Sequence, residues 1–343
     1  MRILVAGATG SIGIHVVNTA IAMGHQPVTL VRNRRKIKLL PRGTDIFYGD
    51  VSIPETLTDL PKDIDAIIFT LGSDGQGRIG ARAIDYGGVR NILRIFMDTP
   101  VRIALMTTIG VTERLSSWNQ RTEVHDWKRR SERLVRASGH IYTIVRPGWF
   151  DYNNDDEHRI VMLQGDRRHA GTPEDGVISR EQIAQVLVTA LSNDAAKNKT
   201  FELVAERGEA QQDLTPLFAE LRNDNPQKND GVFDIDNMPL TEEPECVIND
   251  LNLYSKNSKN LTTLSYDSQS YDSLELYIYR SRRRKLFPIF VNFQIYRLKQ
   301  VSDMKALLIT ALFMEFISVN TASAAEEIHH ADSKVDDQVL IAE

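Results

Sequence analysis

Short apolar runs alternate with longer stretches of helical periodicity over about the first 220 residues. The apolar runs predict strands at Arg2–Ala6, Pro27–Val31, Asp45–Tyr48, Ala66–Thr70, Val101–Met106, Ile141–Val145 and Thr200–Ala205. The periodic stretches predict helices at Ile12–Met23, Ile79–Met97, Asn119–Ser138 and Leu214–Leu221. Strands that alternate with helices in this way predict an α/β fold with a doubly wound parallel sheet.

Two capping boxes add helix starts to this pattern. Ser52 is followed three residues later by Glu55, and Ser179 is followed at the same spacing by Gln182. A serine with an acidic or amide residue at this distance satisfies free backbone N–H groups at the start of a helix. We therefore expect a short helix after Ser52 and a longer one from Ser179 to about Leu191.

Regular patterning ends near residue 222, so we divide the chain into a folded domain over residues 1–222 and a low-order polar and basic tail over residues 223–303. Within this tail, Asn249–Ser273 is rich in asparagine, aspartate, serine and lysine without a sustained period, which predicts an irregular segment. The cluster Arg280–Lys285 is interpreted as a solvated charge run, with a nucleic-acid or membrane contact as the alternative.

The segment over residues 304–343 has the pattern of a secretory signal peptide in the wrong place. Met304 and Lys305 precede the apolar stretch Ala306–Val319, and the small residues Ala322–Ala324 follow it. Two interpretations stay open. The segment is a join to the start of a neighbouring gene, or it is an amphipathic C-terminal helix.

Composition and charge narrow the function classes. The chain has 343 residues and a net charge of -5, which gives no overall reason to bind nucleic acid or an anionic membrane. Its one cysteine, Cys246, excludes an internal disulfide and a cysteine-rich zinc site, and favours a reducing compartment. Met1 leads directly into the first predicted strand without a signal peptide, so we expect a cytoplasmic protein. His158 and His169 have no companion at ligand spacing, so no metal site is expected.

Three glycines stand between the first predicted strand and the first predicted helix, in the run Gly7-Ala8-Thr9-Gly10-Ser11-Ile12-Gly13. In such a loop one glycine forms the tight turn, one lets the backbone approach a pyrophosphate, and one lets the helix pack close to the strand. The helix N-terminus offers N–H groups and partial positive charge to that pyrophosphate. The loop therefore predicts a dinucleotide site in a Rossmann-type sheet, with a purely structural turn as the alternative.

The glycine spacing resembles that of the extended and atypical short-chain dehydrogenase/reductase superfamily. Further elements of that superfamily are similar to Leu30–Asn33, Gly49–Val51, Thr143–Gly148, Ile178–Arg180 and Phe201–Leu203. Over residues 1–222 the chain resembles the small NmrA-like NAD(P)H-binding proteins, which include flavin or biliverdin reductase types and quinone reductase types. The resemblance implies a nicotinamide cofactor. It places Asp50 and Val51 beside the adenine, and Leu71 and Gly72 beside the ribose.

The end of the second predicted strand favours NADP(H) over NAD(H). An NAD site places an acidic residue there to bind the ribose 2′-hydroxyl. Arg32 stands there instead, and Arg34, Arg35 and Lys36 follow. Guanidinium groups match a 2′-phosphate, so we expect Arg32 to be the leading contact, while some of the other cations fit a solvated loop. The full set of expected cofactor contacts is Gly7, Thr9, Gly10, Ser11, Ile12, Gly13, Arg32, Arg35, Asp50, Val51, Leu71, Gly72, Thr107 and Lys128.

The catalytic pattern of the superfamily is incomplete in this chain. Typical members carry a Tyr-x-x-x-Lys pair, in which the tyrosine protonates the carbonyl oxygen as hydride arrives. Lys128 matches the lysine, but Val124 stands where the tyrosine belongs and transfers no proton. Thr107 and Thr108 match the serine pair that precedes the tyrosine, although threonine also suits the end of a strand. We therefore expect Thr108 and Lys128 to be the catalytic residues.

The missing tyrosine argues against a typical alcohol dehydrogenase and favours a small planar acceptor such as a flavin or a quinone, whose ring delocalises the hydride. Protons would come from water or from the nearby candidates His125, Asp126 and Tyr142. Side chains that could stack on a flat substrate, or form a hydrophobic lid instead, are Trp149, Phe150 and Tyr152.

We therefore expect an NADP(H)-binding oxidoreductase. The alternative is a non-catalytic NADP(H)-dependent redox sensor that binds a partner protein. A nucleotide-sugar epimerase-like enzyme is a weaker third interpretation, because those enzymes also use the tyrosine. The sequence leaves open whether the protein is a monomer or a homodimer.

Overall fold

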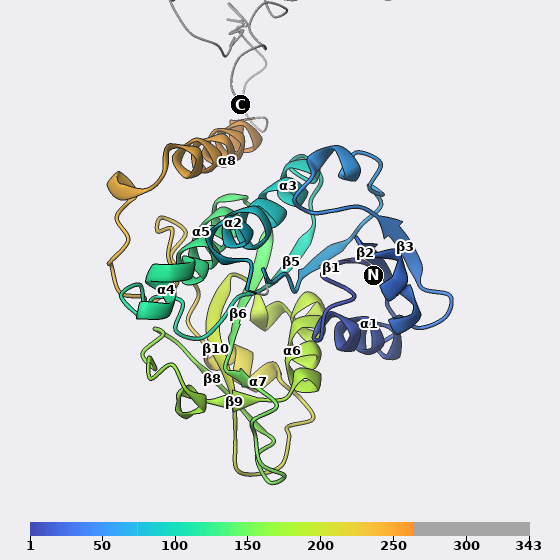
Figure 1. The fold of residues 1–343 in the computed structure, drawn as a ribbon, viewed down its shortest axis with the longest axis vertical. Coiled ribbons are helices and arrows are strands. Elements are labelled where there is room, and N and C mark those ends of the chain that lie inside the picture. The colour runs from blue at the N-terminus through green and yellow to red at the C-terminus, as the bar shows by residue number, and fades with distance from the viewer. Residues whose placement is uncertain (74, 264–343) are drawn as a thin grey trace, which may run out of the picture. The chain divides into compact units, whose positions relative to one another are not determined.

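Strand β1 (Arg2–Ala6) lies inside a ten-stranded sheet in the computed structural model, which describes residues 1–73 and 75–263. Its neighbours β2 (Gln26–Val31) and β4 (Ala66–Phe69) both run parallel to it. Beyond β2 lies β3 (Asp45–Tyr48), again parallel (Figure 1). The chain therefore builds the sheet outward in one direction from β1 to β3 and then in the other from β4. Open α/β sheets bind ligands at the carboxyl ends of the strands where this direction reverses.

The second half of the sheet continues with β5 (Arg102–Met106), β6 (Ile141–Pro147) and β10 (Lys199–Glu206), each parallel to the strand before it in the sheet. Three further strands lie around β10, namely β7 (Trp149–Phe150), β8 (Arg159–Leu163) and β9 (Val177–Ile178). Both β8 and β9 are antiparallel to β10. These three strands were not predicted, because they are short or lack a regular alternation. The predicted doubly wound parallel sheet itself is confirmed.

Helices cover both faces of the sheet. On one face α1 (Gly13–Ala22) and α6 (Arg180–Ser192) bury their apolar sides against Ile3 and Val5, and on the other α3 (Gly87–Ile95) and α5 (Val124–Ala137) pack against Leu4 and Ala6. Alternate residues of β1 thus face opposite cores, as expected for a central strand. The remaining α-helices are α2 (Gly77–Gly80), α4 (Ser117–Thr122), α7 (Thr215–Glu220) and α8 (Glu245–Thr263).

Two of the predicted helices are interrupted in the structure. The stretch expected at Ile79–Met97 contains a π-helical segment, Ala81–Tyr86, between α2 and α3. The stretch expected at Asn119–Ser138 is broken at Glu123, whose φ of 55° places it in the left-handed region between α4 and α5. Periodicity does not register such local changes, because the apolar face continues on both sides of the break.

The two capping boxes differ in outcome. Ser179 Oγ accepts a hydrogen bond from the Gln182 N–H and starts α6 as predicted. Ser52 is turned the other way, because its hydroxyl donates to Asp50 Oδ1 at 2.7 Å. The short helix after Ser52 is a 3₁₀ helix at Pro54–Leu57 and has no side-chain cap.

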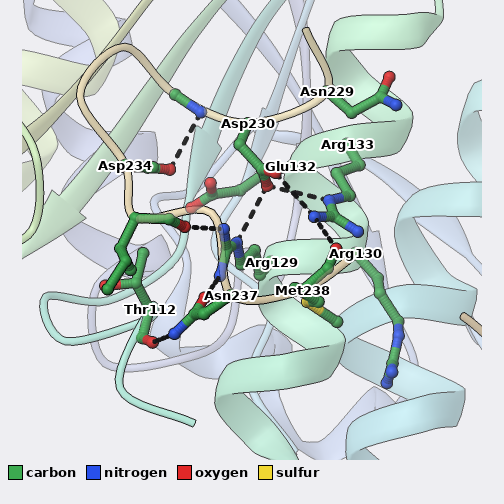
Figure 2. A network of polar contacts seen from close by, with 12 residues as sticks. Thr112, Arg129, Arg130, Glu132, Arg133, Asn229, Asp230, Asp234, Asn237 and Met238 are labelled. Carbon is green, nitrogen blue, oxygen red and sulfur yellow. Dashed lines mark hydrogen bonds and ion pairs between the residues drawn. The ribbon is translucent and has the colours of Figure 1, made fainter. Parts of the chain in front are cut away.

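Residues 224–243, which we call the strap, pack along α5 (Figure 2). The strap is rich in carboxylates, and α5 presents arginines to it. Asp230 lies between Arg129 and Arg133, with N–O distances of 2.9 and 2.7 Å. Glu243 binds Arg130 at 2.6 Å and Arg133 at 3.0 Å.

A second set of carboxylates surrounds Arg146 of β6. Its guanidinium donates to Asp234 of the strap and to Glu132 of α5, with both closest distances at 2.7 Å. Neighbouring carboxylates outweigh the cost of burial and raise the pKa of Arg146. Burial alone would raise the pKa of Asp234, but the charge and hydrogen bonds of Arg146 keep it well below its usual value.

The ordered strap and α8 differ from the irregular tail expected after residue 222. The strap buries few apolar side chains and is held by ion pairs and backbone carbonyls, so it leaves no hydrophobic period to detect. The helix α8 is anchored by Val247, Leu251 and Tyr254 on the α3–α5 face, within the segment expected to be irregular from Asn249. The rest of that segment, the cluster Arg280–Lys285 and the signal-peptide-like residues 304–343 lie outside the described residues.

Candidate functional site

The glycine loop after β1 has the geometry of a phosphate-binding turn. Gly7 has a φ of 97°, and a side chain there would lie 2.7 Å from the carbonyl oxygen of Thr70. Gly13 begins α1 so close to Gly7 that a Cβ atom would overlap the Gly7 carbonyl oxygen. A Cβ atom on Gly10 would meet only that same oxygen, at 3.1 Å. The outer side of the loop at Gly10 is therefore open to a ligand.

The start of α1 also leaves backbone donors free. The N–H groups of Ser11 and Ile12 have no acceptor within the part of the chain that the structure describes. The helix has no side-chain cap and no acidic residue in its first turn. Free N–H groups and the helix dipole together bind anions. The loop Gly7–Gly13 therefore fits a pyrophosphate.

Arg32 stands at the end of β2, where the sequence placed it. Its side chain is 62% exposed, and its Nη1 lies 3.8 Å from Asp50 Oδ2 at the end of β3. Asp50 is fixed in turn by the N–H of Ser52, which donates to Oδ1 at 2.9 Å. The guanidinium is thus oriented at the carboxyl edge of the sheet while most of its donors face solvent.

The residues that follow Arg32 form a 3₁₀ helix, Arg34–Leu39. Asn33 caps this helix, because its Oδ1 accepts from the N–H of Arg35 at 3.0 Å. The guanidinium of Arg34 lies over the ring of Tyr48, 4.1 Å from the centroid. Arg35 is exposed. The cations predicted from the sequence therefore stay on the surface beside the carboxyl ends of β2 and β3.

Val51 and Leu71 pack together against α3 at the carboxyl edge of the sheet. A Cβ atom on Gly88 would lie 2.9 Å from both side chains, so the glycine permits this contact. Asn91 holds this pair in place by donating from Nδ2 to the Val51 carbonyl at 2.8 Å. Gly72, the next residue after Leu71, is exposed. These positions lie beyond β3 and β4, where the resemblance places the adenosine.

Lys128 projects from α5 to the end of β4. Its Nζ lies 2.8 Å from Asp85 Oδ1 and donates to the Leu71 carbonyl at 3.3 Å. The Asp85 side chain is fully buried and comes from the π-helical segment, a feature that often occurs at functional sites. Lys128 is therefore held by a buried carboxylate instead of by a tyrosine hydroxyl.

Sequence reasoning missed Asp85. The residue lies in the buried stripe of its helix, next to Ile84 and one turn after Ala81. An acidic residue in an otherwise apolar stripe is the signal that would have found it, because a carboxylate is buried only with a cationic or hydrogen-bonding partner.

The first turn of α5 contains Val124, the residue at the position predicted for the tyrosine. Val124 begins the helix and packs against the α3–α5 core. His125 follows it and lies one turn before Lys128. Its Nδ1 is 3.3 Å from the Glu113 carbonyl, and its Cε1 would be 3.8 Å from a Cβ atom on Gly110. Burial lowers the pKa of His125, so the neutral imidazole is favoured.

The two threonines after β5 differ in their availability. Thr107 is buried, and its hydroxyl donates to Glu132 Oε1 at 2.7 Å. Its side chain therefore belongs to the ionic cluster around Arg146. Thr108 is half-buried, and its hydroxyl donates only locally, to the Ile109 carbonyl at 3.2 Å. Of the pair, Thr108 has the hydroxyl that a ligand could reach.

One proton-donor candidate from the sequence is wrong. Tyr142 lies at the amino end of β6, whereas the site lies at the carboxyl ends of the strands. Its hydroxyl donates to Asp224 of the strap at 3.1 Å, and burial raises its pKa further. Asp126 is held by Arg114 at 3.2 Å and by Asn119 at 3.0 Å. Of the two candidates on α5, His125 shares a helix face with Lys128, because the two residues are three positions apart.

The loop between β8 and β9 folds over the end of β5 and was not predicted. Asp166 accepts from the N–H groups of Gly110 and Thr112, at 2.6 and 2.7 Å. Burial would raise the pKa of Asp166, but His169, Arg146 and these N–H groups outweigh it and lower the pKa. The hydrogen bond to Asp166 in turn raises the pKa of His169.

Two of the three aromatic residues predicted to stack on a substrate are exposed after β6. Trp149 and Tyr152 meet edge to face with their centroids 6.0 Å apart, and Tyr152 is 62% exposed. Phe150 lies beneath the guanidinium of Arg180. Trp149 and Tyr152 thus present ring surface to solvent after the carboxyl end of β6, and Phe150 is partly covered.

Over residues 1–73 and 75–263, no three histidine, cysteine or acidic side chains gather in a way that could hold a metal ion. No helix among them is long and apolar enough to cross a membrane.

Comparisons with known proteins agree with this geometry. A family described as NAD(P)H-binding matches residues 7–194, more than half of the chain. The photosystem II assembly factor Ycf39 of Synechocystis is 26% identical over 229 residues, which cover 66% of this chain and 69% of that protein. Sanguinarine reductase of Eschscholzia californica is 27% identical over 233 residues, covering 56% and 85%. The oxidoreductase ylbE of Lactococcus lactis shares the fold, with a TM-score of 0.52 and 16% identity over 66% of this chain and 100% of that one.

Proposed function

The chain belongs to the NAD(P)H-binding family, and from this we propose that it is an NADP(H)-dependent oxidoreductase that reduces a planar acceptor such as a flavin or a quinone. One observation carries the proposal: the carboxyl edge combines an open glycine loop with Lys128, and Val124 stands at the position four residues earlier. Sanguinarine reductase, 85% of which is covered by the match, is a reductase by name.

The choice of NADP(H) rests on Arg32. No carboxylate ends β2, and Arg32 stands there with its guanidinium oriented by Asp50 and its remaining donors in solvent. A 2′-phosphate placed there would take charge-assisted hydrogen bonds from this group. Arg35 lies on the next turn and adds positive charge.

The choice of a planar acceptor rests on which side chains near Lys128 could donate a proton. When bound, a reduced nicotinamide supplies hydride. Lys128 is held by Asp85 and would orient the nicotinamide ribose, while Val124 offers no proton. A carbonyl would need a general acid at this position, whereas a flavin or quinone spreads the added charge over its ring and takes its proton from water. Thr108 and the exposed faces of Trp149 and Tyr152 would position that ring.

The test is turnover by the full chain. NADPH consumption would be followed with riboflavin, FMN, biliverdin and a short-chain quinone, alongside a simple aldehyde and a simple ketone. We expect oxidation of NADPH with at least one planar acceptor and none with the carbonyl compounds. Lys128→Met should lower kcat/KM for that acceptor, because Lys128 contacts the cofactor. Preference for a carbonyl substrate would contradict the proposal.

A second candidate is a non-catalytic NADP(H)-dependent sensor that binds a partner protein. The missing tyrosine favours it, and Ycf39 is an assembly factor by name. Saturable NADPH binding without turnover on any acceptor would select this candidate.

A further inference from the structure

The loop between β8 and β9 carries a cation that no carboxylate balances. Arg168 is half-buried, and its one hydrogen bond among the described residues runs from Nη1 to the Asp175 carbonyl at 3.3 Å. Three other cations around the acceptor side are paired: Lys128 with Asp85, Arg114 with Asp126, and Arg180 with Asp151. Arg167, the preceding residue of the loop, is exposed and also has no carboxylate partner among the described residues.

Two carboxylates of the same loop already accept hydrogen bonds from backbone N–H groups. Asp175 accepts from Ala170 at 2.6 Å and from Gly171 at 2.7 Å, which closes the loop on itself. Asp166 accepts from Gly110 and Thr112. The loop therefore fixes the backbone around Arg168 while most of the donors of its guanidinium stay free.

Arg168 lies beside the segments that follow β5 and β6. Its carbonyl oxygen would lie 3.9 Å from a Cβ atom on Gly110, after β5, and its Nη1 3.4 Å from one on Gly176. Gly176 packs on Gly148, which follows β6. Gly176 also contacts Val204, which shares a face of β10 with Glu202 and hence lies on the α5 side of the sheet. Arg168 is therefore at the carboxyl edge and on the same side as Lys128.

We propose that Arg168 binds an anionic group, a carboxylate or a phosphate, on the acceptor. This inference rests on the proposed function and adds the substrate class: a planar ring with an acidic side group. A half-buried guanidinium without a counterion gains charge-assisted hydrogen bonds when such a group arrives. An uncharged analogue of the same ring makes no such bonds, so Arg168 sets specificity and takes no part in hydride transfer.

Matched pairs of acceptors test the inference. FMN differs from riboflavin by a phosphate, and biliverdin differs from its dimethyl ester by two carboxylate charges. For the full-length protein we expect kcat/KM to be about tenfold or more higher for the anionic member of at least one pair. Arg168→Gln should bring that ratio close to one and leave the neutral member unchanged. Arg168→Lys should restore part of the ratio.

Arg42→Gln is the matched control, because it removes the same charge from an exposed loop before β3, at the opposite edge of the sheet. It should leave the ratio as it is in the wild type. A ratio near one for both pairs in the wild type, or a ratio that Arg168→Gln does not change, would overturn the inference.

Binding of FMN and biliverdin to the NADP⁺-loaded protein, measured by calorimetry, separates this inference from the proposed function. Binding that depends on Arg168 without turnover would contradict the oxidoreductase and support the anion site. Turnover without dependence on Arg168 would do the reverse. Absence of binding by either anionic compound would overturn the anion site.

Discussion

At the scale of single residues, the glycine loop separates folding from binding. Gly13 packs against the Gly7 carbonyl with no room for a further atom, so it serves the packing of α1 on β1. A Cβ atom on Gly10 would lie 3.1 Å from that same carbonyl oxygen and would meet no other atom within 4 Å. Two glycines three residues apart therefore carry different costs when they are replaced.

Gly13→Ala should destabilise the fold, whereas Gly10→Ala should mainly weaken dinucleotide binding. The first adds a methyl group that overlaps backbone, a contact that costs about 1–3 kcal/mol or more when the chain has to shift. The second places its methyl group where the pyrophosphate would approach. Thermal unfolding and NADPH titration of both variants would show this. Equal losses of stability in the two variants would contradict the assignment.

Arg32→Ala should remove the preference for NADPH over NADH. Loss of a charge-assisted contact with the 2′-phosphate should weaken NADPH binding by about 1–3 kcal/mol. NADH lacks this phosphate, so its affinity should hardly change. Fluorescence titration with both nucleotides measures the two affinities, and Arg42→Gln is the control for general charge. Parallel losses of both affinities would mean that Arg32 does not read the phosphate.

Glu202 should make stability depend on pH near neutrality. Burial raises the pKa of Glu202 from 4.5 to about 7, although Arg146 opposes the shift. Between these values the folded protein holds a proton that the unfolded chain has released, so this contribution to stability is present at low pH and is lost as pH rises through about 7. In Glu202→Gln this loss is absent.

Urea unfolding of the wild type and Glu202→Gln at pH 5 and pH 8 measures the effect. The variant should gain on the order of 1–3 kcal/mol relative to the wild type between these two pH values. Glu206→Gln, at the exposed end of the same strand, should show no comparable gain. An equal difference at both pH values would show that Glu202 is already ionised in the folded protein.

At the scale of elements, the hydrophobic pattern predicted the strands and helices that bury apolar side chains in the core. The strands β1 and β3 have the predicted bounds, and α6 begins at its predicted cap. The carboxyl ends of β1 to β4 then determined where the loop Gly7–Gly13 and Arg32 would meet. The strap was not predictable in this way, because its order comes from ion pairs with residues roughly a hundred positions away. The roles proposed for Asp85 and Arg168 depend on which side chains lie next to them in the folded protein. A sequence alone does not show these neighbours.

Asp230→Asn should destabilise the packing of the strap on α5. Asp230 lies between Arg129 and Arg133, so the change leaves two buried guanidinium groups short of negative charge. Removing one partner from a buried ionic cluster costs about 3–5 kcal/mol. Chemical denaturation measures the loss. Asp156→Asn, which removes the exposed partner of Arg207, should cost no more than about 1 kcal/mol.

At the scale of the whole molecule, the nucleotide-binding unit extends beyond the family match. The match ends at residue 194, but the structure continues beyond it. Strand β10 completes the sheet, and the strap and α8 cover α5. A chain that ends at residue 222 would expose Arg129 and Arg133 without their carboxylate partners and would leave Arg136 with Glu132 alone. It would also uncover the apolar residues against which α8 packs.

We therefore expect a chain ending at residue 222 to unfold at a lower temperature and to aggregate, and a chain ending at residue 263 to remain folded. Differential scanning fluorimetry and size-exclusion chromatography of the two truncated chains compare them directly. The same unfolding temperature for both would show that the strap and α8 are dispensable for stability.

Helix α5 positions Lys128 at the site and binds the strap through its arginines. Because it does both, few of its positions can be substituted without loss. Eight of its 14 residues are buried, against four of the ten in α1, although α5 is by far the more polar helix. In a library of random variants, α5 should tolerate fewer exchanges than α1, and the intolerant positions should include its arginines. A ranking of positions by hydropathy would place the two helices in the opposite order.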